Sequence, residues 1–233
     1  MQSDNFYKVI KTVYPKTDKI DVAGFSFGGR VALAIASKYP YLIRKLHVTG
    51  VAAHRDNYGN IILASWRDIF SSNFKDTKNP TIDEKQSLLK AFAWSSILSC
   101  YSSNFLSRDD VGIKRINDWV KFICDNNTFE GLAAILYQTH YTDNNPWHTA
   151  SIAERIAAVA KSKSSNNNIR LLVGENDILA TPNEVQNLAN ILSSRENDND
   201  KKTAVCVIPN SGHAVPIEQP RLWRNDLLSF LRD

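Results

Sequence analysis

The sequence has few cysteines and no long hydrophobic run. Its three cysteines, Cys100, Cys124 and Cys206, are far apart and odd in number. This argues against a Cys-x-x-Cys metal site and a secreted disulfide framework. No apolar stretch approaches the ~18–20 residues that a membrane-spanning helix needs, and the first residues lack the basic-then-apolar pattern of a signal peptide. We therefore expect a cytoplasmic protein with no membrane span, with an organelle left open because a targeting segment could be missing.

Charge of one sign is not concentrated anywhere in the chain. Lys plus Arg number 28 and Asp plus Glu number 24, which gives a net charge of +4 with the two signs interspersed. Nucleic-acid-binding proteins usually gather their basic residues into a block or arm, so we expect no nucleic-acid partner. A hydrophobic fraction of 43% and a charged fraction of 22% are typical of a globular protein. Collagen-like, low-complexity and wholly disordered chains are excluded.

The first 51 residues show the pattern of a βαβ unit. An apolar strand is predicted at 19–25, a sharp turn at Gly28-Gly29, a helix at 30–38 and a second strand at 43–51. A helix between two strands predicts a parallel sheet. Two more strands are predicted at 169–173 and 203–208. Three more helices are predicted at 4–14, 183–192 and 220–231.

The middle of the chain, residues 52–165, is helical in character. Helices are predicted at 61–74, 81–106, 111–125, 129–141 and 149–160, with prolines and glycines between them. We interpret 52–165 as a helical lid inserted into an α/β core made of 1–51 and 166–233. Trp66, Trp94 and Trp119 lie on apolar faces of these helices. They either form the core of the lid or line an apolar acyl pocket, and the sequence does not separate the two.

The segment Gly24-Phe25-Ser26-Phe27-Gly28 is a G-x-S-x-G pentapeptide between a predicted strand and a predicted helix. A nucleophilic serine must stand on a very tight turn, and glycine at both flanking positions removes the clash. The turn also directs the backbone N–H of Phe27 toward the oxyanion that forms on attack. The alternative is an incidental serine in a tight βα turn.

A serine hydroxyl needs a base, and the base needs an acid to orient it. Asp177 follows the third predicted strand and His213 follows the fourth. Because functional groups gather at the carboxyl ends of parallel strands, we expect Ser26, Asp177 and His213 to meet. Taken singly, His213 is typical of a loop histidine and Asp177 of a cap or turn residue. Glu175 is a second carboxylate in reach of the same turn.

Three stretches together resemble the α/β-hydrolase fold superfamily of lid-containing serine hydrolases. They are the strand, elbow and helix that begin DVAGFSFGGRVALAIASKYP, the segment LLVGENDILATP at 171–182, and the segment NSGHAVPIEQP at 210–220. The order serine, acid, histidine is also that of the superfamily. The middle of the chain matches only by position.

The resemblance implies Ser26 as the nucleophile, His213 as the general base and acid, and Asp177 as its orienting partner. It implies a hydrolase of a small or lipid-like carboxylic ester, thioester or lactone, with no metal and no organic cofactor. A serine at the elbow argues against epoxide hydrolase or haloalkane dehalogenase chemistry, which uses a carboxylate nucleophile.

The sequence departs from that superfamily before the elbow. Only 25 residues precede Ser26, where the superfamily has four strands and a loop with a second oxyanion donor. The strand at 19–25 is then an apolar sheet edge, which invites pairing with another chain. We hypothesise a truncated gene product or one part of a larger assembly, with a partner chain over this edge. The alternative function is a catalytically impaired or inactive relic, or a binding module.

Other histidines offer weaker candidates. His140 and His148 flank Trp147, but no carboxylate or cysteine lies beside them at ligand spacing, so we expect surface or lid histidines and no metal. His54-Arg55-Asp56 follows the second predicted strand at the mouth of the predicted pocket. This tripeptide either contacts substrate or forms a turn or salt bridge.

Overall fold

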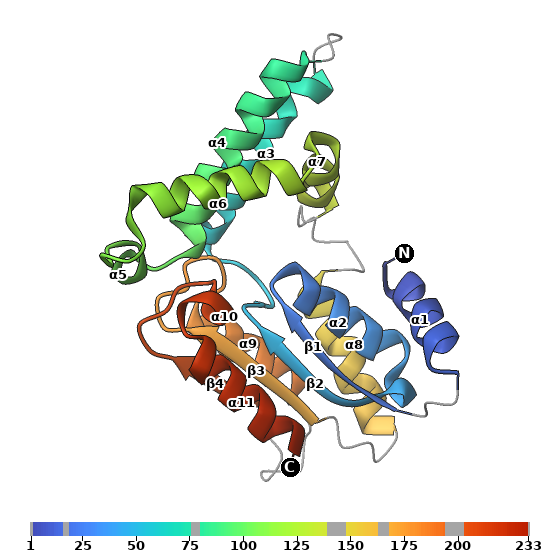
Figure 1. Ribbon diagram of the computed structural model, residues 1–233. Coiled ribbons are helices and arrows are strands. Elements are labelled where there is room, and N and C mark those ends of the chain that lie inside the picture. Colours follow the sequence, from blue (N-terminus) through green and yellow to red (C-terminus); the bar gives the residue numbers. More distant parts are fainter. Residues whose placement is uncertain are drawn as a thin grey trace.

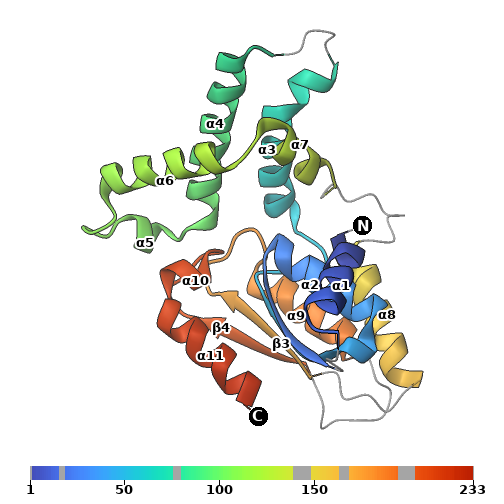
Figure 2. The same cartoon turned by 45° about the vertical axis from the view of Figure 1, so that its right-hand side comes forward.

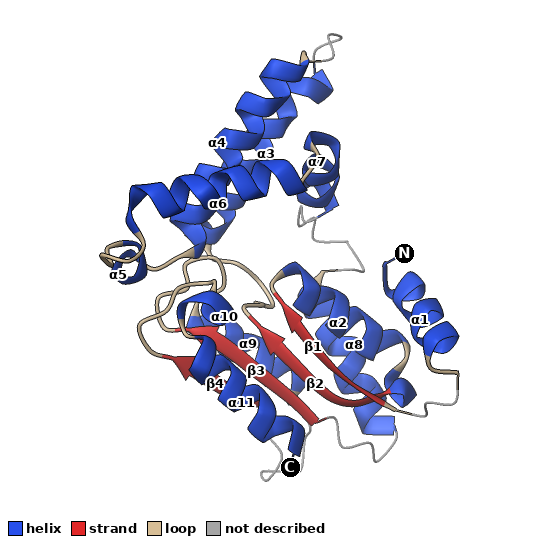
Figure 3. Cartoon of the chain, in the orientation of Figure 1, coloured by secondary structure: helices blue, strands red, loops and turns tan. Residues whose placement is uncertain are grey.

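The computed structural model describes residues 2–15, 19–75, 80–138, 148–162, 168–193 and 203–232. The strands in these ranges form one parallel sheet in the order β1-β2-β3-β4 (Figures 1 and 3). They are β1 (Ile20–Phe25), β2 (Ile43–Thr49), β3 (Asn168–Gly174) and β4 (Ala204–Ile208). The predicted α/β class with a partial parallel sheet is thus confirmed.

Helices cover both faces of this sheet (Figures 1 and 2). One face carries α2 (Phe27–Lys38), α8 (Thr149–Ser162) and α9 (Pro182–Leu192), with α1 (Gln2–Val13) packed against α2. The other face carries α10 (Val215–Glu218) and α11 (Pro220–Arg232). Side chains alternate along a strand, so β2 contributes to both layers, whereas Asp21, Ala23 and Phe25 of the edge strand β1 are exposed.

The alternation is clear on β2. Leu46 and Val48 enter the large core beneath α2, α8 and α9. Lys45, His47 and Thr49 are also buried, on the α11 side. There the Lys45 ammonium donates to the Phe230 carbonyl at 2.6 Å, and the Trp223 indole N–H donates to the Thr49 hydroxyl at 3.0 Å. The polar side chains of β2 on the α11 side are therefore buried with hydrogen bonds to that helix.

The carboxyl ends of the strands lie together at one end of the sheet. Phe25 pairs with Thr49 in the β1–β2 register, and Gly174 pairs with Ile208 in the β3–β4 register. The turns that follow the strands, including the one that carries Ser26, are therefore close together, as expected for a parallel sheet.

A helical insert of α3 to α7, residues 57–138, stands over the carboxyl ends of the strands (Figures 1 and 2). Its helices are α3 (Asn57–Lys75), α4 (Ile82–Cys100), α5 (Ser103–Leu106), α6 (Gly112–Asn126) and α7 (Phe129–Gln138). Trp66, Phe70 and Phe92 form the centre of its main core. Leu179, from the turn after β3, packs into the same cluster, so the insert rests directly on the turns that follow the strands.

Some helices differ from the prediction. The helix predicted at 30–38 begins at Phe27, so Gly28 and Gly29 lie in α2 and the sharp turn is at Ser26. The predicted helix at 81–106 is two helices, because Ser102 begins α5 by accepting the Phe105 N–H at 3.2 Å. The helix predicted at 149–160 packs with the sheet, not with the insert. Its residues Ala153 and Ile156 are buried in the core beneath α2, since small and branched side chains at helical spacing fit that layer.

Two simpler expectations can be compared with the structure. All three cysteines are free. Among the described helices, none is both long and apolar enough to cross a membrane.

Candidate active site

Ser26 lies on a strained turn between β1 and α2. Its φ of 50° and ψ of −119° fall in a region that residues other than glycine rarely adopt, and such strain persists only where the surroundings enforce it. The Ser26 N–H donates to the Thr49 carbonyl at 2.9 Å. A Cβ on Gly24 would lie 2.6 Å from the Gly28 carbonyl oxygen. Gly24 is therefore required for the chain to fold back so tightly.

Gly28 does not have the steric role expected of it. A Cβ on Gly28 would meet nothing within 4 Å, and its φ is not positive. The second crowded glycine is Gly29, where a Cβ would lie 2.6 Å from a methyl carbon of Val51. The expectation that both glycines of the pentapeptide relieve a clash is correct for Gly24 and wrong for Gly28.

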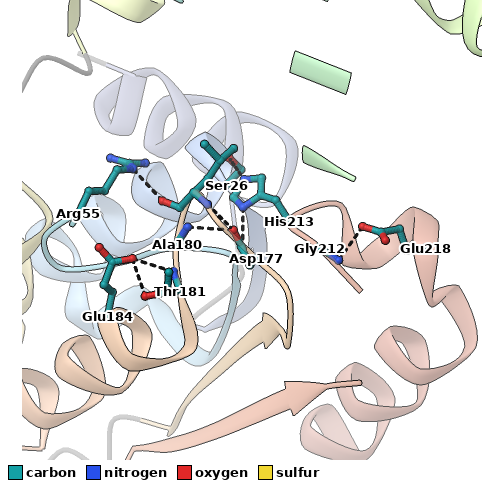
Figure 4. A network of polar contacts seen from close by, with 10 residues as sticks. Ser26, Arg55, Asp177, Ala180, Thr181, Glu184, Gly212, His213 and Glu218 are labelled. Carbon is teal, nitrogen blue, oxygen red and sulfur yellow. Dashed lines mark hydrogen bonds and ion pairs between the residues drawn. The ribbon is translucent and has the colours of Figure 1, made fainter. Parts of the chain in front are cut away.

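The structure brings Ser26, His213 and Asp177 together (Figure 4). His213 Nε2 lies 2.8 Å from Ser26 Oγ, and His213 Nδ1 lies 2.8 Å from Asp177 Oδ2. A carboxylate only accepts hydrogen bonds, so the Nδ1–H of His213 donates to Asp177. In the neutral ring this leaves Nε2 to accept the Ser26 hydroxyl proton, which is the protonation state a general base requires.

Asp177, and not Glu175, is the carboxylate that contacts the histidine. Asp177 is 2% exposed, and its other oxygen accepts the N–H groups of Leu179 and Ala180 at 2.8 and 2.9 Å. The exposed Glu175 instead accepts the Asn210 N–H at 3.0 Å. These two backbone donors fix the orientation of the Asp177 carboxylate.

His213 is almost fully enclosed, with 3% of its surface exposed. Gly50, with a φ of +66°, lies against the ring, since a Cβ there would be 3.0 Å from His213 Cε1. The Phe25 ring packs against the His213 ring, with the two ring centroids 5.3 Å apart. The imidazole is thus held by packing as well as by hydrogen bonds.

Sequence reasoning did not identify Glu218, a buried acidic residue beside the site. Glu218 lies five positions after His213 and accepts the Gly212 N–H at 2.9 Å (Figure 4). The only signal was a single acidic residue in the mostly apolar segment VPIEQP, and such a pattern does not distinguish a surface carboxylate from a buried one.

The remaining candidates fall outside this constellation. The Arg55 guanidinium donates to the Leu179 carbonyl at 3.1 Å, which favours the structural interpretation of His54-Arg55-Asp56. The rings of His54 and His148 lie 4.9 Å apart, while His140 and Trp147 lie outside the described residues. Within the ranges that the structure describes, no three potential ligands gather as a metal site.

The tryptophans of the insert act as core residues where the contacts are clear. Trp66 is 7% exposed, its ring packs edge-on against Phe92, and its indole N–H donates to the Ser95 hydroxyl at 3.0 Å. Trp119 is half-buried and stacks with Tyr101. For Trp66, the contacts favour the core interpretation over a pocket lining.

No protein-family model matches the chain, and no curated protein matches its sequence. Solved structures do match its shape. An α/β hydrolase, MGS-M2, from a Medee basin deep-sea metagenome library is 18% identical, with a TM-score of 0.73 over 99% of this chain and 70% of that one. A thermophilic esterase from Thermogutta terrifontis is 21% identical, with a TM-score of 0.64 over the same shares. A meta-cleavage product hydrolase from Pseudomonas fluorescens IP01 is 15% identical, with a TM-score of 0.60, again over 99% and 70%.

This likeness and the strand–elbow–helix geometry define the class of the molecule: the protein has the α/β-hydrolase fold. The resemblance read from the three sequence stretches is therefore confirmed at the level of the fold. Each match extends over nearly all of this chain but only 70% of the matched chain.

Proposed function

We propose that this protein is a serine hydrolase with Ser26 as nucleophile, His213 as general base and acid, and Asp177 as the residue that orients His213. One observation carries the proposal: an unbroken hydrogen-bonded chain runs from Asp177 through His213 to Ser26 on a strained turn. Fold alone does not imply function, whereas this geometry is the one that activates a hydroxyl.

The proposed reaction needs only groups that the chain supplies. Ser26 Oγ attacks the carbonyl carbon while its proton moves to His213 Nε2. The imidazolium is stabilised by Asp177 and then returns the proton to the leaving oxygen or sulfur, which gives an acyl-enzyme. A water molecule, activated by His213, then attacks the acyl-enzyme in the same way, which releases the carboxylic acid and restores the Ser26 hydroxyl.

The N–H of Phe27 is the proposed donor to the oxyanion. Phe27 is the first residue of α2, so its N–H has no acceptor within the helix. The positive end of the helix dipole also favours negative charge at this place. Preorganised donors of this kind stabilise the tetrahedral intermediate.

We propose a small or lipid-like carboxylic ester, thioester or lactone as the substrate, with the helical insert as a lid over the site. The position of the insert above the carboxyl ends of the strands supports its role as a lid (Figure 2). The similar structures include a thermophilic esterase, which supports an ester substrate.

The test is hydrolysis of p-nitrophenyl esters of increasing acyl length and of a simple lactone, by the wild-type chain and by Ser26→Ala. We expect turnover by the wild type and a loss of about 10⁴-fold or more in Ser26→Ala, as for removal of a triad serine. Equal rates for the two proteins would contradict the proposal.

A second candidate is a binding module that keeps the triad without turnover. One observation favours it. The hydrolase fold takes a second oxyanion donor from a loop that precedes the nucleophile strand, and each of the similar hydrolase structures is covered over only 70% of its length. Losing one oxyanion donor typically costs ~10²–10³-fold in turnover. The same assay separates the candidates, since a binding module gives no difference between the wild type and Ser26→Ala.

A further inference from the structure

One buried carboxylate has no part in the proposed chemistry. Glu218 is the last residue of α10 and is 4% exposed. A buried carboxylate is strongly unfavourable unless hydrogen bonds replace the water it has lost. The groups that donate to Glu218 therefore show what this residue holds in place.

The two oxygens of Glu218 bind two different parts of the chain. Oε1 accepts the N–H of Gly212, the residue directly before His213, at 2.9 Å. Oε2 accepts the N–H of Ser102 at 3.1 Å and its hydroxyl at 2.5 Å. Ser102 is 5% exposed and belongs to the insert corner, residues 100–102, where α4 gives way to α5. One carboxylate thus joins the histidine loop to the helical insert.

The insert corner packs tightly on the histidine loop. The Ala214 N–H donates to the Cys100 carbonyl at 2.9 Å. A Cβ on Gly212 would lie 2.7 Å from the Ser102 nitrogen and 3.0 Å from the Cys100 oxygen. Because not even a methyl group fits between them, a displacement of the corner would displace the loop that carries His213.

The insert corner brings no charge of its own to this place. Burial, together with the negative charges of Asp177 and Glu218, raises the pKa of the Cys100 thiol to about 12. The thiol therefore stays neutral near pH 7. The groups that hold Glu218 are two backbone N–H groups and a hydroxyl, so the carboxylate is fixed by direction rather than by a counter-charge.

We propose that Glu218 is a positioning residue for His213, and that it couples the docking of the helical insert to the placement of the imidazole. The inference rests on the proposed function. Glu218 fixes the Gly212 peptide, which sets the direction in which His213 leaves the loop, and through Ser102 it ties that peptide to the insert. Glu218 touches no reacting atom, so its loss lowers kcat and leaves KM unchanged.

The test is Glu218→Gln, which replaces one carboxylate oxygen with an N–H₂ group that faces a donor. Hydrolysis of p-nitrophenyl acetate is measured, with kcat expressed per Ser26 titrated by a saturating fluorophosphonate so that misfolded chains do not count. We expect kcat to fall by about tenfold or more, since a buried donor loses its acceptor, with KM within about twofold.

Glu184→Gln is the matched control. Glu184 also has a carboxylate with three donors: the Thr181 N–H at 2.7 Å, the Thr181 hydroxyl at 2.9 Å, and the N–H of Asp56. It joins the start of α9 to the chain that enters α3, at a distance from Glu218 and Gly212 (Figure 4). We expect kcat within about twofold of the wild type.

Ser102→Ala is the second variant, because it removes one donor and keeps the Gly212 contact. We expect a smaller fall in kcat, about threefold, with the same unchanged KM. If Glu218→Gln does not fold, Ser102→Ala decides, and a wild-type kcat in that variant overturns the inference. An active wild type with unchanged kcat in both variants contradicts the inference alone. A wild type with no ester hydrolysis contradicts the proposed function as well.

Discussion

At the scale of single residues, the two glycines that flank Phe25 and Phe27 in the pentapeptide behave differently. An alanine at position 24 places a methyl group against the backbone of α2, whereas one at position 28 enters open space. We expect Gly24→Ala to lower the free energy of unfolding by about 1–3 kcal/mol or more and Gly28→Ala to change it by less than about 0.5 kcal/mol. Urea denaturation of both variants measures this, and equal effects would contradict the geometry.

The two carboxylates after β3 give the second prediction at this scale. Asp177→Asn removes the acceptor that holds the His213 tautomer, and we expect kcat to fall by about 10⁴-fold, the loss typical of this change in a triad. Glu175→Gln alters only the exposed contact with Asn210, and we expect kcat within a few-fold of the wild type. Steady-state kinetics at neutral pH measure both. The reverse order would reassign the acid.

Much of the candidate site could be predicted from the sequence, because its residues lie directly after strands. Ser26, Asp177 and His213 each follow an apolar strand, and parallel strands bring such positions together. The choice of Asp177 over Glu175 needed the backbone donors of Leu179 and Ala180. Glu218 was missed because its partners, Gly212 and Ser102, meet only in the folded chain.

At the scale of elements, α11 is held to the sheet by a cluster of charges around Asp226. The Asp226 carboxylate contacts His47 at 3.1 Å and Arg170 at 2.5 Å, with its own side chain 10% exposed. Burial alone would raise the pKa of Asp226, but the hydrogen bonds from His47 and Arg170 outweigh it and hold this pKa well below its usual range.

A carboxyl group with a lowered native pKa stabilises the fold above its unfolded pKa of about 4, and this stabilisation is lost as the pH falls through the native pKa. We expect Asp226→Asn to lower the free energy of unfolding near pH 7 by about 3–5 kcal/mol. We also expect a weaker acid dependence than the wild type below about pH 4. Urea denaturation across this range measures both effects.

Asp21→Asn is the control for this prediction. Asp21 pairs with Arg44 at the surface, where an ion pair contributes only ~0–1 kcal/mol. If Asp226→Asn is no more destabilising than Asp21→Asn, the cluster does not anchor α11.

The elements were predictable where hydrophobic periodicity was strong. All four strands and helix α11 lie within a few residues of their predicted ranges. The break between α4 and α5 was not predictable, because no proline or glycine marks it and the cap at Ser102 depends on Glu218, which is 116 residues away. The place of α8 against α2 was also hidden, since an apolar helix face does not show which core it joins.

At the scale of the whole molecule, β1 lies at one edge of the sheet. Its residues Asp21, Ala23 and Phe25 are exposed, while Val22 is buried beneath α2. We propose that another polypeptide segment pairs with this edge, because an open strand edge is a template for pairing. In the chain alone, we expect amide hydrogens of β1 to exchange at least about tenfold faster than those of the central strand β3.

Hydrogen exchange followed by mass spectrometry tests this edge. The chain is measured alone and as isolated from its native cell extract, and slower exchange of β1 in the second sample identifies a covering segment. A monodisperse monomer in which β1 is as protected as β3 would contradict the proposal.

The most direct measurement for the account as a whole is the reaction of the folded chain with a fluorophosphonate, followed by mapping of the modified peptide. The probe reacts with a serine whose base and oxyanion site are assembled. The triad geometry predicts one adduct on Ser26, absent in Ser26→Ala and strongly slowed in a His213→Ala chain. A folded wild-type chain that gains no adduct, or gains it on another serine, would contradict the central claim.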